Sequence, residues 1–465
     1  MDPDQTKLKE AVNQGPSPST AAKPSNFLEE QLRGAAPIYN GRPRSKQGLP
    51  LEIYHPVFHA FTQRIQSNDI PDSDSLRAME FFMSISQAVY ACEAQRTLAV
   101  KNHLKSLLGV EAITVEPANS CTADGVIMTK SHVAIDDPSA YLLVMEVKNE
   151  VGTGDSDPSI QGAKSYARYW SDDNLDYVRK ASCCPSFILA IAGPWVCMLG
   201  AVWTENIVVH PFTEYIWMGR QVHDDDRLCQ LTRMFIALRE GIYSLRRYYD
   251  TLPKQCQEIP GRFFPYIKEF SLDGENVQFD YLETLALSPA RPVFRAVVRS
   301  NPDRLIVVKF VRNYNSDAHK ILGAHSLAPR LIYDSAKTLD CGFRMIVMEH
   351  IDGPDLFAYL KSHPTEDCIN QIRADVRCAL TLLHQKHLVF GDLRKPNILV
   401  VRKQQGLGAM LIDFDWCSTH REGRYPLSLN DTAKMWTQGI ARGGLMDKKH
   451  DNDMLGILFS PEDPF

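Results

Sequence analysis

The chain has 465 residues, a length that indicates about three ordinary domains, or two large ones with a tail. Hydrophobic residues make up 44% of it and charged residues 23%, which excludes wholesale disorder and a single small disulfide-stapled module. The formal net charge of -5 excludes a uniformly basic nucleic-acid binder, so DNA would have to bind at local basic patches.

The first 50 residues differ in composition from the rest. They are rich in Pro, Ser, Gln and Gly and poor in aromatic side chains, so we expect residues 1–50 to form a disordered or loosely docked arm. They lack the apolar stretch of a secretory signal, and the most apolar run, residues 187–203, is shorter than the ~20 residues of a membrane span. The 11 cysteines include no CxxC pair, which favours a reducing compartment. We therefore expect an intracellular protein without a membrane partner.

Two folded regions follow the arm. Apolar side chains recur at helical spacing from Ser75 to Gly109, and short apolar runs then alternate with helical patterns, which predicts an α/β domain over residues 51–250. Residues 251–262 contain prolines and predict a linker, and a second domain occupies residues 263–465. The runs that predict strands are 113–115, 125–128, 141–148, 187–191, 198–203, 293–298 and 305–311, and helices are predicted at 161–170 and from 226 to about 249.

Two charged residues, Glu146 and Lys148, end the apolar strand predicted at 141–148. Side chains at i and i+2 of a strand share a face, and an acid and a base held together there are costly unless they act chemically or are solvated. Asp124 opens the preceding strand, in a position to approach Glu146. We expect the two carboxylates to bind Mg²⁺ while Lys148 steadies the attacking water and the developing charge of a phosphodiester displacement.

This Asp…Glu-x-Lys arrangement resembles the PD-(D/E)XK nuclease superfamily, here without the Pro before the Asp. On the next predicted helix Gln161, Lys164 and Arg168 share one face, which predicts contact with a DNA backbone. The resemblance implies that Gln161 matches the Gln that follows the Lys strand in many members, and that Glu93 is a further acidic metal ligand. The alternative interpretation is a surface salt bridge at a strand end beside an amphipathic helix.

The most specific motif is GDLRKPN at residues 391–397, followed by LIDFDW at 411–416. It resembles the protein kinases, because Asp392 and Asn397 keep the five-residue interval of their catalytic loop and Asp413 takes the position of the DFG aspartate. The resemblance implies that Asp392 accepts the hydroxyl proton of the acceptor, and that Asn397 and Asp413 bind Mg²⁺.

The resemblance also implies a nucleotide site earlier in the chain. Lys309, in the predicted strand at 305–311, takes the position of the lysine that contacts the α- and β-phosphates of ATP. The segment that contains Glu349 and Ile351 resembles the hinge that binds adenine through its backbone. The chain is thus expected to bind ATP and Mg²⁺ as cofactors.

Several positions depart from the kinase pattern. The expected Gly-rich loop before Lys309 contains prolines, and no Glu lies between Lys309 and Glu349, so the usual lysine partner is missing unless Asp317 substitutes. Phe390 replaces the usual His, and Asp415 replaces the Gly of DFG. A pseudokinase that serves as a binding surface therefore remains an alternative, as does a small-molecule phosphotransferase of the aminoglycoside or choline kinase type.

A few other residues are assigned structural roles. His384 and His387, just before the catalytic loop, are expected to be packing residues. His450 and Asp451 lie in the charged run at 448–455, which we interpret as a solvated stretch.

The combination resembles the Crinkler-type effectors of fungi. It implies a restriction-endonuclease-like mixed-sheet core (α/β) followed by a compact protein-kinase-like domain (α+β). The resulting hypothesis is a bifunctional Mg²⁺-dependent enzyme that hydrolyses DNA and phosphorylates Ser/Thr side chains of a protein substrate that the sequence does not identify. Family analogy implies action in the nucleus or cytoplasm, after secretion into a host cell. The alternative is a degenerate nuclease that binds DNA, joined to a pseudokinase scaffold.

Overall fold

The computed structural model divides into two units. The first is formed mainly by residues up to Ile267 and the second mainly by those from Lys268, shortly after the predicted linker at 251–262. Residues 253–258 of that linker lie outside the described part of the chain. The structure describes residues 3–115, 123–129, 139–220, 224–252, 259–285, 291–403, 406–431 and 436–459.

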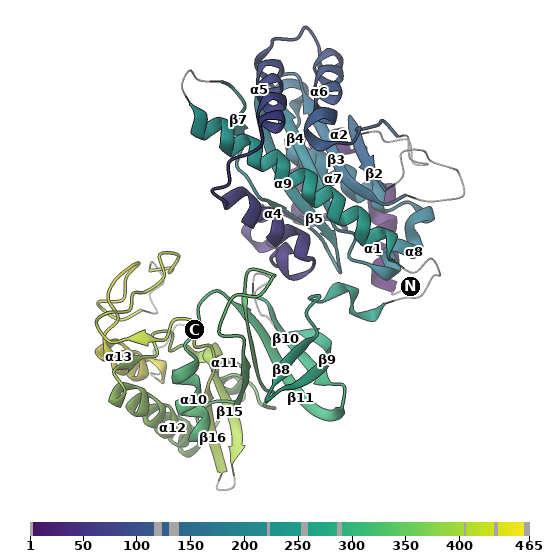
Figure 1. Ribbon diagram of the computed structural model, residues 1–465. Helices are drawn as coiled ribbons and strands as arrows, with labels where there is room; N and C mark the ends of the chain where they lie inside the picture. The colour runs from purple at the N-terminus through teal and green to yellow at the C-terminus, as the bar shows by residue number, and fades with distance from the viewer. Residues whose placement is uncertain are drawn as a thin grey trace. The chain divides into compact units, whose positions relative to one another are not determined.

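A mixed sheet forms the centre of the first unit (Figure 1). Within the described residues its order is β1-β6-β5-β4-β3-β2, with β7 paired to β5. β3 (Tyr141–Lys148) pairs in parallel with β4 (Ser186–Ala192) and antiparallel with β2 (Gly125–Met128), and every residue of β3 is buried. Burial on both faces explains its continuous apolar run. The other strands are β1 (Ile38–Tyr39), β5 (Trp195–Trp203), β6 (Ile207–Pro211) and β7 (Ile216–Trp217).

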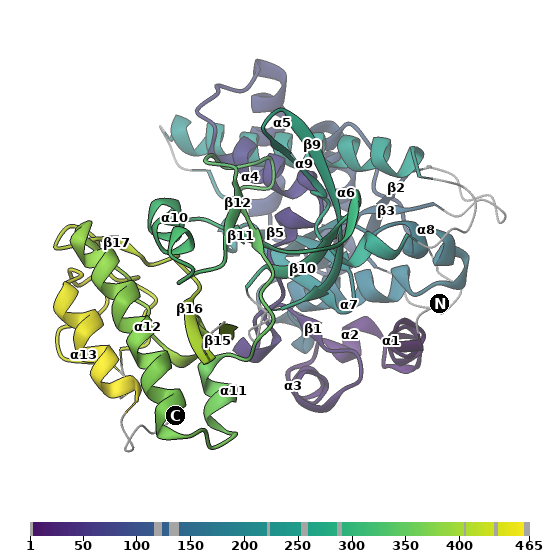
Figure 2. The ribbon, with the colours of Figure 1, turned by 90° about the horizontal axis from the view of Figure 1, so that it is seen from below.

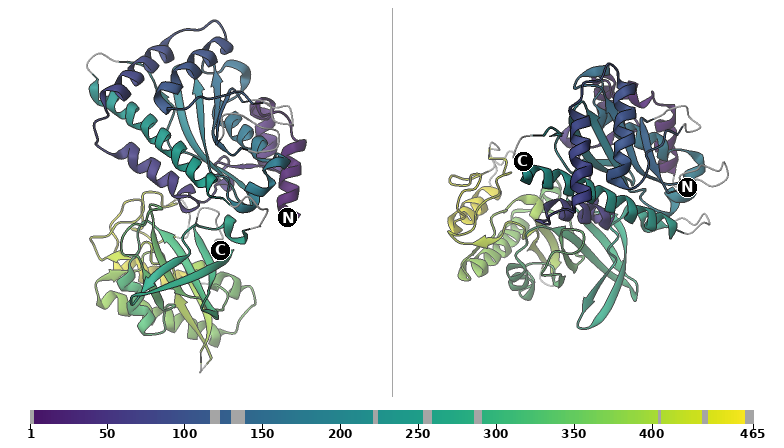
Figure 3. Two further views of the ribbon diagram at one scale, coloured as in Figure 1. Left: turned by 45° about the vertical axis from the view of Figure 1, so that its right-hand side comes forward. Right: turned by 45° about the horizontal axis from the view of Figure 1, so that its top comes forward.

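Helices cover both faces of this sheet (Figures 1 and 3). α7 (Pro158–Trp170) packs on β3 and β4 from one face, while α9 (Asp225–Asp250) crosses the other face beside α4, α5 and α6. α7 begins at Pro158 because Asp157 caps it, accepting a 2.8 Å hydrogen bond from the backbone N–H of Ser159. The remaining helices are α4 (Pro56–Gln66), α5 (Ser73–Gln87), α6 (Glu93–Leu108) and α8 (Asp176–Ala181).

The N-terminal arm is folded from Pro3 on, so the prediction of a disordered residue range 1–50 was wrong. β1 joins the sheet by pairing in parallel with β6, and Ile38 is fully buried there. Phe27 packs with Ala22 and Ile160, which lies on α7. The arm has few apolar side chains, but these pack against the sheet and against α7. Average composition does not report where individual apolar residues pack, so it wrongly predicted disorder. Its helices are α1 (Pro3–Gln14), α2 (Pro18–Ala21) and α3 (Pro24–Arg33).

The second unit combines an antiparallel sheet with a helical part, in which α12 and α13 lie side by side (Figure 2). The sheet order within the described residues is β12-β13-β11-β10-β9-β8, and β14-β17 and β15-β16 form two small ladders. The strands are β8 (Glu269–Leu272), β9 (Glu275–Thr284), β10 (Val293–Val298), β11 (Asn301–Val311), β12 (Leu331–Asp334), β13 (Arg344–Glu349), β14 (Leu388–Val389), β15 (Ile398–Lys403), β16 (Gly406–Leu411) and β17 (Ser418–Thr419). The helices are α10 (Ser316–Ala324), α11 (Leu356–Leu360), α12 (Glu366–Gln385) and α13 (Lys448–Leu458).

None of the helices in the described part of the chain combines the length and the apolar character needed to cross a bilayer.

Candidate functional site

Lys309 lies on β11 between two carboxylates. Its Nζ is 2.6 Å from Oδ1 of Asp413 and 2.5 Å from Oδ1 of Asp415, and its side chain is only 7% exposed. Burial lowers the pKa of Lys309, but the charges of Asp413 and Asp415 outweigh it and raise that pKa above its ordinary value. The lysine is therefore a fixed cation in the site.

Both carboxylates come from residues 413–415, which we call the DFG-like segment. Asp413 has a φ of 72°, a left-handed conformation that costs a non-glycine residue about 1–3 kcal/mol and that the surrounding contacts must hold. Burial raises the pKa of Asp415, with Lys309 opposing the rise and Asp413 adding to it. The residue that replaces the usual glycine thus takes part in the charged cluster.

The catalytic loop holds Asp392 rigidly. Arg394 donates from Nε and Nη2 to the two carboxylate oxygens of Asp392, at 2.5 and 2.6 Å. Asn397 Nδ2 donates to Asp392 Oδ2 at 2.8 Å and to its backbone oxygen at 2.9 Å. The amide nitrogen of Asn397 therefore fixes the loop, which leaves its amide oxygen as the group suited to a metal ion.

Asp451 stabilises this loop through hydrogen bonds to its backbone. Both His450 and Asp451 are buried, so the interpretation of these residues as a solvated stretch was wrong. The Asp451 side chain is 1% exposed and accepts hydrogen bonds from the backbone N–H groups of Phe390 and Gly391, at 2.8 and 2.9 Å. His384 Nε2 lies 2.9 Å from the same carboxylate. A charged run in sequence gave no sign of this role, because the donors come from another part of the chain.

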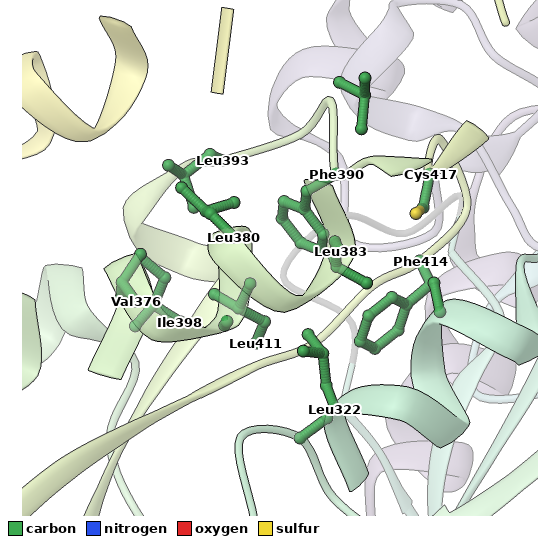
Figure 4. Packing of buried hydrophobic residues seen from close by; sticks show 14 of the residues in the cluster. Leu322, Val376, Leu380, Leu383, Phe390, Leu393, Ile398, Leu411, Phe414 and Cys417 are labelled. Carbon is green, nitrogen blue, oxygen red and sulfur yellow. The ribbon is translucent and has the colours of Figure 1, made fainter. Parts of the chain in front are cut away.

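Phe390, which replaces the usual His, belongs to the core. Its ring packs edge-on against Phe414 at 5.7 Å between centroids, and Leu322 of α10 lies beside Phe414 in the same cluster (Figure 4). His319, also on α10, stacks on Phe414 at 4.7 Å. An aromatic ring at position 390 therefore packs between the catalytic loop and the DFG-like segment.

The suggestion that Asp317 replaces the missing glutamate was wrong. Asp317 is exposed. His319, which lies on the buried side of α10 with Ala318 and Leu322, bonds Tyr314 and the backbone oxygen of Pro329. The carboxylates that reach Lys309 come from the DFG-like segment instead.

The predicted hinge follows β13. Glu349 lies at its end, where its backbone N–H donates to Arg330 O and its side chain accepts from Arg330 N. Ile351 is half-buried just beyond it. Adenine binding by this segment stays a prediction. Residues 286–290 form part of the segment where kinases usually have a Gly-rich loop. These residues lie outside the described part of the chain.

These side chains fit ATP with Mg²⁺ by their chemistry. Asp413 and Asn397 offer the oxygen ligands that Mg²⁺ prefers, and Lys309 offers a cation for the phosphates. Such a metal ion neutralises the charge that develops on a transferring phosphoryl group.

In the first unit, Glu146 lies on β3 and Asp124 lies just before the neighbouring strand β2. Asp124 directly precedes β2, and its Oδ2 accepts a 2.8 Å hydrogen bond from the backbone N–H of Val147 on β3. Glu146 is fully buried and accepts hydrogen bonds from Gln161 Nε2 at 2.7 Å and Ser165 Oγ at 2.5 Å. Ser165 was expected on the same face of this helix as Gln161, but its hydrogen bond to Glu146 was not predicted.

Burial disfavours the ionised forms of both carboxylates in this cluster. Burial raises the pKa of Glu146 well above its ordinary value, and the charge of Asp124 adds to the rise. Burial also raises the pKa of Asp124, which the hydrogen bond from Val147 opposes. A divalent cation beside these carboxylates would favour their ionised forms.

The predicted set of three acidic metal ligands is not formed. Glu93 instead lies 3.5 Å from the Nζ of Lys148. Among the residues that the structure describes, no group of three or more His, Cys, Asp or Glu could hold a metal ion. Mg²⁺ here would have to be held by Asp124 and Glu146 together with backbone and water oxygens.

The α7 face predicted to contact DNA is covered, so an open basic face was the wrong expectation. Gln161 bonds Glu146, Lys164 pairs with Glu30 at 2.6 Å, and Arg168 donates to three backbone oxygens of the arm. All three side chains are at most 7% exposed. The folded arm, which the sequence did not predict, explains the difference.

Comparison with known proteins shows similarity to kinases. The family described as "Protein kinase domain" matches residues 328–435, so the second unit contains a protein kinase domain. The chain is 24% identical over 156 residues to the serine/threonine-protein kinase sgk-1 of Caenorhabditis elegans, covering 31% of this chain and 33% of that protein. It is 30% identical over 142 residues to the human cAMP-dependent protein kinase catalytic subunit PRKX, covering 28% and 38%. The chain thus spans little more than a third of the length of these relatives.

Two solved kinase structures are also similar in part. One is the Cydia pomonella granulovirus kinase PK-1, with a TM-score of 0.32, 21% identity and coverage of 38% of this chain and 66% of that one. The other contains the Rad53 kinase domain in complex with AMPPNP, with a TM-score of 0.24, 20% identity and coverage of 30% and 51%. The nuclease and Crinkler-type assignments of the sequence analysis stay predictions.

Proposed function

We propose that the second unit is an active protein kinase that transfers phosphate from ATP to Ser/Thr hydroxyls of a protein. The observation that carries this proposal is a pair of hydrogen-bonded groups, Lys309 with Asp413 and Asp392 with Asn397. A backbone hydrogen bond of 3.0 Å from Ile412 N–H to Asn397 O joins the segments that carry them. A binding scaffold has no physical need for all four side chains. The Ser/Thr kinase relatives support the same choice of acceptor.

Each residue has a distinct task in the transfer. Lys309 would hold the α- and β-phosphates, while Asn397 and Asp413 would hold a Mg²⁺ ion, which would neutralise the phosphate charge. Asp392 accepts the proton of the acceptor hydroxyl as the new oxygen–phosphorus bond forms and the bond to ADP breaks. Arg394 keeps Asp392 in position until the acceptor arrives, because it binds both carboxylate oxygens.

The test is transfer of label from radioactive ATP, in the presence of Mg²⁺, to the chain itself and to a mixed protein substrate. The wild type should label protein, and Asp392→Asn should reduce labelling at least ~10³-fold while circular dichroism shows an unchanged fold. No label with the wild type, or full label with Asp392→Asn, would overturn the proposal. Label found on a small acceptor such as choline or an aminoglycoside would favour the small-molecule alternative.

A second activity, Mg²⁺-dependent hydrolysis of DNA by the first unit, is proposed from Asp124, Glu146 and Lys148. The placement of Asp124 and Glu146 on paired segments supports it, as does the hydrogen bond from Gln161 to Glu146, because Lys148 lies on the same strand as Glu146. Asp124 and Glu146 would bind the ion and Lys148 would stabilise the charge on the cleaved phosphate. The Crinkler-type resemblance would place such an enzyme in the nucleus, reached in that family by secretion into a host cell.

Cleavage of plasmid DNA with and without Mg²⁺ tests the second activity. Glu146→Ala and Lys148→Ala should each abolish cleavage without unfolding the chain. Cleavage that survives both changes would show that another site or a contaminant is responsible. Retained DNA binding without turnover would favour the degenerate nuclease.

A further inference from the structure

We propose that Asp415 is the positioning partner of the ATP-binding lysine, Lys309, in the role that a glutamate of the preceding helix has in other kinases. The inference rests on the proposed kinase function and deepens it. Its direct observation is the 2.5 Å contact between Lys309 Nζ and Asp415 Oδ1, at a lysine that is 7% exposed.

The helix before the site cannot supply this partner. α10 carries one acidic residue, Asp317, and its side chain is exposed. The inner face of the helix instead presents His319, which stacks on Phe414 and bonds the backbone oxygen of Pro329. Pairing of Lys309 therefore does not depend on an acidic side chain from α10.

Asp413 is the other carboxylate at Lys309, but its chemistry assigns it to the metal ion. Asp413 and Asp415 flank the buried Phe414, and both carboxylates reach the same ammonium group. Once Asp413 binds Mg²⁺, Asp415 is the carboxylate left to hold Lys309. The ammonium has three N–H donors, so the bond to Asp415 leaves two donors for phosphate oxygens.

This arrangement places the lysine partner and the metal ligand two residues apart on one segment. The Phe414 ring anchors that segment in the core, between Phe390 and His319. Lys309 is consequently oriented by the packing of Phe414 rather than by the position of a charged helix. The aspartate in place of the DFG glycine then has a specific task in nucleotide binding.

Four variants and two controls test the inference. Asp415→Asn removes the charge, Asp415→Gly restores the residue usual in kinases, Asp415→Glu keeps the charge, and Lys309→Met removes the partner. Asp317→Asn tests the helix, and Asp375→Asn removes a carboxylate that pairs with Lys403 at 2.7 Å elsewhere in the unit. The full chain is used, and calorimetric binding of AMP-PNP with Mg²⁺ is measured beside the KM for ATP and kcat.

Asp415→Asn and Asp415→Gly should each weaken AMP-PNP binding and raise the KM at least ~10-fold, as expected for a lost charged hydrogen bond. Asp415→Glu should recover part of the loss, both controls should stay within about twofold, and Asp415→Asn should add little in a Lys309→Met background. Unchanged binding in Asp415→Asn or Asp415→Gly, or independent effects of Asp415→Asn and Lys309→Met, would overturn the role of Asp415.

The outcome separates this inference from the kinase proposal. Wild-type binding of AMP-PNP that Asp415→Asn weakens, without any label transfer, would remove the proposed activity and keep the role of Asp415. No binding by the wild type would overturn the role together with the nucleotide site.

Discussion

Arg394 donates hydrogen bonds from Nε and Nη2 of its guanidinium group to the two carboxylate oxygens of Asp392, at 2.5 and 2.6 Å. Burial lowers the pKa of Arg394, but the charge of Asp392 outweighs it and raises that pKa. The indole rings of Trp416 and Trp436 lie 5.5 and 5.6 Å from the guanidinium carbon. Asp392, the proposed base, is thus oriented by the Arg394 guanidinium, and cation–π contacts with the two indole rings stabilise that guanidinium in turn.

Arg394→Ala should reduce kcat for phosphate transfer about 10- to 100-fold with a smaller change in the KM for ATP, because Asp392 loses its fixed orientation. Arg394→Lys should recover only part of the rate, since an ammonium group lacks the two-pronged geometry. Steady-state kinetics with labelled ATP measure both. A rate equal to wild type in Arg394→Ala would show that Asn397 alone orients the base.

Asp451→Ala should destabilise the second unit by about 2–5 kcal/mol, because it leaves two buried N–H groups, those of Phe390 and Gly391, without their acceptor. Asp451→Asn keeps an acceptor oxygen and should cost less. The free energy of unfolding in urea measures the difference, with Asp453→Ala on the same helix as the control. Equal stability of Asp451→Ala and Asp453→Ala would contradict a supporting role.

Arg168→Ala should loosen the N-terminal arm, since Arg168 donates to the backbone oxygens of residues 13, 15 and 16. Limited proteolysis should then cut within the first 36 residues faster than in the wild type. DNA binding by the intact chain should stay unchanged in this variant, because the side chain is buried under the arm. A clear loss of DNA affinity with unchanged proteolysis would restore the original prediction of a DNA-contacting face.

Mg²⁺ should raise the melting temperature of the first unit, and Glu146→Gln should abolish this shift. The variant keeps the shape of the side chain while it removes a charge that burial disfavours, so its stability without Mg²⁺ should equal or exceed that of the wild type. Differential scanning calorimetry measures both. Glu111→Gln, at an exposed pair with Lys105, is the control. An equal Mg²⁺ shift in Glu146→Gln and the wild type would place the ion elsewhere.

His319 should make the second unit sensitive to acid. Burial lowers its pKa from 6.5 to about 4, so below pH 6.5 the unfolded chain binds a proton that the folded chain does not. Stability is therefore highest above about pH 6.5 and falls as the pH drops toward 4, by about 2–3 kcal/mol from this group.

The acid dependence is measured by urea unfolding at pH 7.5 and pH 5. His319→Gln should lower stability at pH 7.5 but flatten the difference between the two pH values. His325→Gln, at the exposed end of α10, is the control and should keep the wild-type difference. An undiminished pH dependence in His319→Gln would assign the effect to other histidines.

Local motifs determined the residues of the kinase-like site. Asp392, Asn397 and Asp413 are recognisable from spacing within one short stretch, because the catalytic loop and the DFG-like segment are nearly contiguous in sequence. Pairing of neighbouring strands likewise predicted that Asp124 lies near Glu146. In both cases the geometry follows from short-range backbone structure, which sequence patterns report well.

Contacts between distant segments were decided only by the tertiary structure. The folded arm buries Lys164 and Arg168, Asp451 reaches back to the amides before Asp392, and Asp415 meets Lys309. Composition and periodicity describe which side chains can be buried but not which partner buries them. The partner of each buried side chain depends on how segments separated by 60 or more residues pack together. A charged side chain that is buried in this way must be paired, and the pairing gives it a structural or functional role.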